Sequence, residues 1–183
     1  GGMTAGSIIT GMAFRLWNGL TSTYTGATWT SYDIRVGESV APNLATTTLA
    51  TNFVGGNTLV QTGALTMSGF TSGNTGATPN GWQNTIAFTT PHVYTGGHLL
   101  IEIRHTGSNI TNPANSFCEA VATNGIGYGT DYRSFTATGN TATVGAQATF
   151  TMTKLSYTAV PEPATMAALG LGVAALLRRR RSK

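Results

Sequence analysis

The sequence contains few charged residues, and this scarcity excludes one class of partner. Asp, Glu, Lys and Arg make up 9% of the chain, against about 25% in ordinary globular proteins. Half of the 10 basic residues stand in the last six positions, and acids and bases are equal in number in residues 1–158. A nucleic-acid surface needs clustered Lys and Arg. The neutral body therefore predicts no nucleic-acid partner.

The chain has a single cysteine, Cys118. It can form no intrachain disulfide and no cysteine-based metal site. A lone cysteine is most often a small buried hydrophobe, and a nucleophilic thiolate would need a neighbouring base. We therefore interpret Cys118 as a packing residue.

Metal ligands are also scarce. The histidines, His92, His98 and His105, match no compact ligand spacing. A calcium site needs clustered oxygens, usually from several acids, which leaves Asp33 and Asp131 as weak candidates. We predict no metal and no cofactor.

Glycine and threonine are abundant, and the pattern favours strands. The 24 glycines fall between short apolar or alternating segments, for example 28–37, 58–67 and 97–105, each of which predicts one strand. No helical period of apolar residues occurs before residue 164, and no internal repeat suggests a propeller or solenoid. The predicted fold is all-β, a two-sheet antiparallel β-sandwich resembling a jelly roll, followed by a short hydrophobic C-terminal helix.

Two regions follow from this pattern. Residues 1–158 are expected to form the β-sandwich domain, and residues 159–183 a sorting or transmembrane segment. The opening stretch "GGMTAGSIITGMAFRLWNG" has neither the basic n-region nor the apolar h-region of a secretory signal peptide. We therefore expect that the N-terminus is truncated and that strands are missing with the signal peptide.

The tail "AVPEPATMAALGLGVAALLRRRRSK" combines three parts. Pro161 and Pro163 prevent a helix from extending back into the body. Residues 164–177 are almost wholly apolar and would form a helix of about 21 Å, which is short for a bilayer core of about 30 Å. The arginine run would stay on the cytoplasmic side as a basic stop. The expected transmembrane positions include Ala164, Leu169, Gly170, Leu171, Val173, Leu176 and Leu177, and the basic stop is Arg178, Arg179, Arg180 and Arg181.

This order of parts resembles the PEP-CTERM sorting signal of Gram-negative bacteria. The resemblance implies export across the inner membrane and recognition of Pro161, Glu162 and Pro163 by an exosortase, a membrane-embedded cysteine transpeptidase. It also implies a transient stay in the inner membrane through the C-terminal helix, removal of the tail, and release to the cell surface or extracellular matrix. Such proteins commonly belong to bacteria that make exopolysaccharide and biofilm.

The body resembles a group of predicted secreted proteins that carry the same signal. The segments "FRLWN", "YDIRVGES", "FTTPHVYTGGHLLIEIRH" and "FCEAV" follow in the group's order, over about residues 13–122. The sequence departs from the group at His92, His98 and Cys118. The resemblance implies a β-sandwich and no activity.

These observations favour a non-enzymatic structural or interaction protein of the cell surface or matrix. One alternative is a carbohydrate-binding module for exopolysaccharide, because aromatic rings stack on sugars and Asn and Thr bond to hydroxyls. The candidate stacking residues are Trp17, Trp29 and Trp82. A second alternative is an enzyme acting on polysaccharide, with a carboxylate pair drawn from Asp33, Glu102 and Glu119. Arginines follow Asp33 and Glu102 at two residues' distance, so cross-strand ion pairs are the simpler interpretation.

Overall fold

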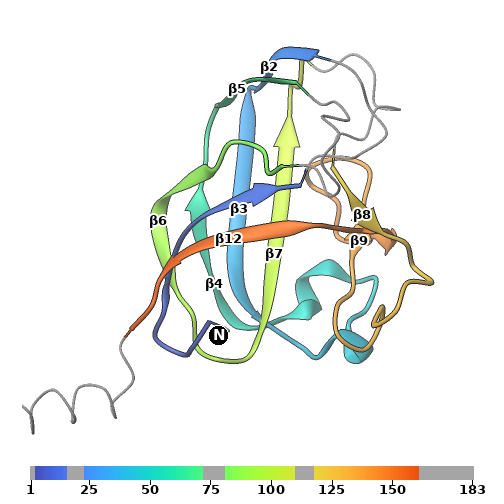
Figure 1. Ribbon diagram of the computed structural model, residues 1–183. Helices are drawn as coiled ribbons and strands as arrows, with labels where there is room; N and C mark the ends of the chain where they lie inside the picture. Colours follow the sequence, from blue (N-terminus) through green and yellow to red (C-terminus); the bar gives the residue numbers. More distant parts are fainter. Residues whose placement is uncertain (1–2, 16–22, 72–80, 110–117, 161–183) are drawn as a thin grey trace, which may run out of the picture.

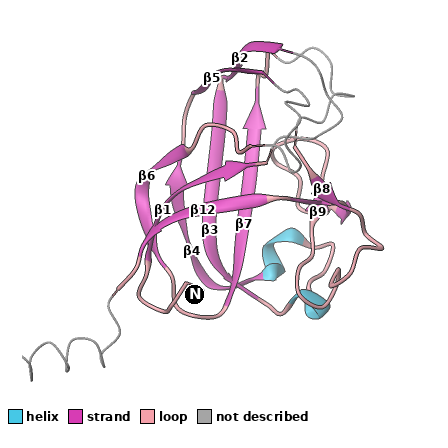
Figure 2. Ribbon diagram, viewed as in Figure 1, coloured by secondary structure: helices cyan, strands magenta, loops and turns pink. Residues whose placement is uncertain are grey.

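The computed structural model describes residues 3–15, 23–71, 81–109 and 118–160, and within these it is built almost entirely of antiparallel strands (Figures 1 and 2). The strands pair in two three-stranded sheets and three two-stranded ones. The two helical pieces are short 3-10 turns, η1 (Pro42–Leu44) and η2 (Leu49–Asn52). The all-β prediction is confirmed. The predicted C-terminal helix lies outside the described residues, and the two-sheet sandwich with jelly-roll topology stays a prediction.

One three-stranded sheet carries both ends of the described chain. Its order is β12 (Thr153–Thr158), β1 (Ile8–Phe14) and β6 (Ile86–Val93). β12 pairs with β1 along its whole length, from Ile8 opposite Thr158 to Phe14 opposite Thr153. The last strand is therefore held by the first, and the chain leaves the domain at the edge of this sheet.

The second three-stranded sheet supplies the longest strands. Its order is β4 (Phe53–Gln61), β3 (Ser31–Ser39) and β7 (His98–Thr106). β3 and β7 pair without a break from Ser31 opposite Thr106 to Ser39 opposite His98. Such an uninterrupted ladder fixes which side chains share a face, because neighbouring residues alternate between the faces.

The core lies between the two sheets. Ile9 and Met12 of β1 pack with Ile34 and Val36 of β3 and with Val60 of β4, and each is at most 1% exposed. In Figure 1, β1 and β12 cross over β3 and β7. β4 and β6 meet where the sheets adjoin, since the Thr89 hydroxyl donates to the Val60 carbonyl at 3.1 Å. Each Å² of apolar surface removed from water stabilises the fold by about 25 cal/mol. Because these are the largest fully buried apolar side chains described, we expect this cluster to contribute most to stability.

The remaining strands are peripheral. β2 (Thr23–Trp29) pairs with β5 (Leu65–Thr71) at one end of the long sheet. β8 (Ala120–Val121) pairs with β11 (Phe150–Thr151), and β9 (Phe135–Thr136) with β10 (Ala146–Gln147).

Two predicted strands are each divided in the structure. Segment 28–37 breaks at Thr30 between β2 and β3, and segment 58–67 breaks at residues 62–64 between β4 and β5. Gly63 lies in the second break with a φ of 90°, a backbone conformation that glycine adopts without the steric cost of a Cβ. The single-strand predictions for these two segments are wrong. Thr30 carries no sequence signal for a break, and one glycine within an apolar run is a weak turn signal. Segment 97–105 matches β7 within one residue.

Candidate functional site: a polar depression on the long sheet

The outward face of β3 and β7 carries a row of charged side chains. Tyr32, Ile34 and Val36 point into the core, so Asp33 and Arg35 between them point outward. The register places Arg35 opposite Glu102 and Asp33 opposite Arg104. Alternation along two paired strands thus brings acids and arginines from both strands to one surface.

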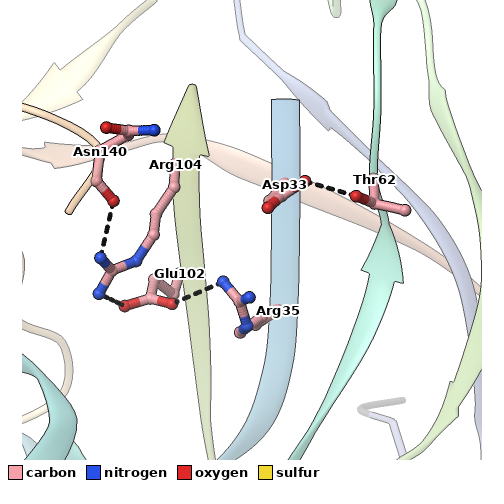
Figure 3. A network of polar contacts seen from close by, with 6 residues as sticks. All are labelled: Asp33, Arg35, Thr62, Glu102, Arg104 and Asn140. Atoms are coloured by element: carbon pink, nitrogen blue, oxygen red, sulfur yellow. Dashed lines mark hydrogen bonds and ion pairs between the residues drawn. The ribbon is translucent and has the colours of Figure 1, made fainter. Parts of the chain in front are cut away.

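Glu102 is the centre of an ion-pair network (Figure 3). One carboxylate oxygen of Glu102 lies 2.7 Å from Arg104 Nη2, and the other lies 3.4 Å from Arg35 Nη1. Arg104 also donates to the Asn140 carbonyl at 2.8 Å. The hydrogen bond to Glu102 raises the pKa of the Arg104 guanidinium. The cross-strand ion pair predicted for Glu102 is present, and it holds both arginines against the sheet.

Asp33 has a different environment. Its carboxylate accepts a hydrogen bond from the Thr62 hydroxyl at 2.6 Å, and no ion pair to Asp33 occurs within the described residues. The ion pair expected for Asp33 is therefore replaced by a hydrogen bond, because Arg104 turns toward Glu102 and Asn140 (Figure 3). Asp33 keeps acceptor capacity that the fold does not use.

These side chains line an open depression of about 590 Å³. Its lining comes from β3 and β7, from β4 and η2, and from the loop that carries Asn140 and Thr141. Phe53 supplies the largest apolar surface in it. The Phe53 ring lies over Gly37 of β3, where a Cβ would come within 3.0 Å of the ring. The absence of a side chain at position 37 therefore lets an aromatic ring continue the outward row.

Of the predicted sugar-stacking tryptophans, the two that the structure describes do not line this depression. Trp29 is half-buried and packs edge-on against Tyr32, with ring centres 5.1 Å apart. Trp82 is 41% exposed. Arg15 and Lys154 lie over its ring, at 5.9 and 5.6 Å from the centroid. Trp17 lies outside the described residues.

The candidate carboxylates divide between two places. Asp33 and Glu102 line the same depression, whereas Glu119 forms an ion pair with Arg15 at 2.9 Å. Asp131 stands in a turn beside Gly127, apart from Asp33. Within the described ranges no three His, Cys, Asp or Glu side chains gather in a way that could hold a metal ion.

Two further groups named in the sequence are largely buried. His92 is 8% exposed, and its Nδ1 lies 3.0 Å from the Thr58 hydroxyl, while Nε2 is buried and has no hydrogen-bond partner. Burial lowers the pKa of His92 and raises the pKa of the Cys118 thiol to about 11. Cys118 is therefore protonated at neutral pH, which fits its interpretation as a packing residue.

The tail begins directly after the last strand. β12 ends at Thr158, and Pro161 follows three residues later, so the sorting residues are separated from the sheet by Ala159 and Val160 alone. A family match covers residues 159–181 and is described as the PEP-CTERM protein-sorting motif. The chain carries a PEP-CTERM motif. This motif marks the chain for export and for exosortase-dependent sorting.

The matched range contains Pro161, Glu162 and Pro163, and recognition of these three residues by an exosortase stays a prediction. The predicted transmembrane positions and the arginine stop lie outside the described residues. Within the part of the chain that the structure describes, no helix has the length and apolar character needed to cross a bilayer. No curated protein and no solved structure matches the chain. The resemblance of the body to predicted secreted proteins therefore stays a prediction.

Proposed function

We propose that the chain is a secreted β-sandwich protein, sorted by its PEP-CTERM motif, that acts by contact at the cell surface or in the extracellular matrix. The observation that carries this proposal is the motif at residues 159–181, joined to an antiparallel domain by Ala159 and Val160. In this proposal the tail holds the chain transiently in the inner membrane until an exosortase removes it. The domain then remains outside the cell.

The neutral body supports an interaction role. Its acids and bases balance, and the ion pairs of Glu102 and Glu119 engage two of the three candidate catalytic carboxylates. A glycoside hydrolase needs one carboxylic acid and one carboxylate placed on either side of the bond. Both carboxylate oxygens of Glu102 contact guanidiniums, so this side chain is already engaged in the fold.

The experiment compares the chain with a variant in which Pro161, Glu162 and Pro163 are all replaced by alanine. Each is preceded by the same secretory signal peptide and expressed in a host that has an exosortase. The unaltered chain is expected in the surface or medium fraction. The variant is expected to accumulate in the inner-membrane fraction at full length. Asp131→Ala, a change outside the motif, is the control and should sort normally. Equal surface delivery of the triple variant would contradict the proposal.

A carbohydrate-binding module for exopolysaccharide is the second candidate function. The observation that favours it is the open polar depression on the long sheet. The tryptophans on which the sequence-based hypothesis relied support it less, because Trp29 is half-buried and the ring of Trp82 is already engaged by two cations. An enzyme acting on polysaccharide is the third candidate, and it would require Asp33 for turnover.

A further inference from the structure

We infer that the depression on the outward face of β4, β3 and β7 binds a neutral polysaccharide chain, with Asp33 and Asn57 as its hydrogen-bonding residues and Phe53 as the apolar contact. This inference assigns a site to the carbohydrate-binding candidate and rests on that candidate, but it does not depend on sorting. The ion pairs of Glu102 with Arg35 and Arg104 hold the side chains around the site in position.

The size and shape of the depression favour a polymer. Its volume of about 590 Å³ lies within the range of about 300–1,000 Å³ typical of ligand sites. Small-molecule sites, however, are mostly apolar and enclose their ligand, whereas this one is open and lined mainly by charged, amide and hydroxyl groups. An open site of this kind suits a ligand that crosses the sheet and extends beyond the site at both ends.

Unused hydrogen-bonding capacity in the depression points to hydroxyl groups. Asp33 accepts one bond, from Thr62, and a carboxylate has two oxygens that can accept several. The amide of Asn57 lines the depression and is exposed. Arg35 uses Nη1 on Glu102, and a guanidinium has five N–H donors in all. Vicinal sugar hydroxyls both donate and accept, so they match a surface that offers carboxylate, amide and guanidinium groups together.

The balance of charges in the depression favours a neutral polysaccharide over a charged one. The four ionised side chains of the depression, Asp33, Arg35, Glu102 and Arg104, sum to zero. The body as a whole is also balanced, so no field attracts a polyanion over a distance. An anionic sugar would meet the free side of Asp33 and be repelled. Phe53 adds an apolar face against which the C–H groups of a pyranose ring can pack.

The test measures retardation of the purified full-length chain, kept in mild detergent, in native gels containing dextran, galactomannan, xyloglucan or hydroxyethylcellulose, with alginate as the anionic comparison. At least one neutral polymer should retard the chain. Asp33→Ala should weaken that binding by about tenfold or more, and Asn57→Ala by about two- to tenfold, the usual effects of losing a hydrogen bond to a charged and to a neutral group. Asp131→Ala makes the same charge change as Asp33→Ala outside the depression and should bind normally.

Two further measurements keep the result interpretable. Asp33→Asn preserves the shape of the side chain, and an unchanged circular dichroism spectrum of this variant with weakened binding separates lost recognition from lost folding. Oligosaccharides of increasing length should compete with rising affinity, because a longer chain can contact more of the residues that line the open depression.

The inference would be overturned by no retardation in any neutral polymer, or by retardation in alginate alone. Binding that is lost in Trp82→Ala and unchanged in the Asp33 and Asn57 variants would also overturn it, while leaving carbohydrate binding itself intact. Since the measurement uses purified protein, none of these outcomes bears on processing by an exosortase.

Discussion

Glu102 and Asp33 lie on the same face of neighbouring strands, yet the structure predicts opposite consequences for removing their charges. The Glu102 side chain is 17% exposed and lies within 4 Å of two guanidiniums. Glu102→Gln would remove the charged carboxylate that both Arg35 and Arg104 contact. We expect a loss of about 1–3 kcal/mol in the free energy of unfolding, the usual effect of removing a hydrogen-bonded charge at a partly buried site.

Asp33→Asn should cost less than about 1 kcal/mol, because the amide oxygen can still accept the hydrogen bond of Thr62 and no ion pair is lost. For a domain of this size, 1 kcal/mol corresponds to about 2–4 °C in the melting temperature. Glu102→Gln should therefore lower the melting temperature by about 2–12 °C, and Asp33→Asn by only a few degrees.

The assay is urea unfolding of both variants followed by tryptophan fluorescence, with the slope compared as a check that the unfolding transition is unchanged. Repeating it in about 1 M salt should reduce the deficit of Glu102→Gln, because salt screens partly exposed charges. Two results would contradict the assignment of Glu102 as a structural carboxylate and Asp33 as a carboxylate free to bind a ligand. One is a larger loss of stability for Asp33→Asn than for Glu102→Gln, and the other is unchanged stability for Glu102→Gln.

Three further predictions concern groups outside the depression. Burial lowers the pKa of His92, so the unfolded chain binds the proton more tightly and stability should fall as the pH drops below about 6.5. Thermal melts of His92→Gln should show a flatter pH dependence than those of the unaltered chain, and an equally steep dependence would contradict this assignment. The pKa of the Cys118 thiol is raised to about 11, so its reaction with a thiol-specific disulfide reagent at about pH 8 should be roughly a hundredfold slower in the folded chain than in urea; equal rates would contradict its burial. Trp82→Ala removes the ring between two cations and should lower the free energy of unfolding by about 1–2 kcal/mol while leaving polysaccharide retardation unchanged; weakened retardation would place the sugar site at Trp82.

Much of the fold could be predicted from local patterns. Alternation along 97–105 located β7, and the arginines two residues after Asp33 and Glu102 predicted cross-strand ion pairs, of which the pair of Glu102 with Arg35 is present. Period-two alternation succeeds here because both strands are buried on one side only. The tail was the strongest signal, since its parts are contiguous in sequence and need no tertiary contact to be recognised.

The depression could not be predicted in the same way. Phe53, Asn57 and Asn140 come from different parts of the chain, and pairing of β4 with β3 together with the loop after β9 brings them near Asp33. Arg104 could pair with either Glu102 or Asp33. Its pairing with Glu102 depends on Asn140, whose carbonyl accepts a hydrogen bond from the guanidinium and holds it in place. The sugar-stacking role of the tryptophans was predicted from residue type alone. Residue type does not reveal that Arg15 and Lys154 lie over the ring of Trp82.

The most direct test of the central claim is the intact mass of the protein recovered from the cell surface or medium of a native host, compared between a strain with its exosortase and one without. The account predicts that the surface species lacks the apolar run and the terminal "RRRRSK", and that the strain without exosortase retains the full-length chain in its inner membrane. Recovery of surface protein that still ends at Lys183, in equal amount from both strains, would contradict the account.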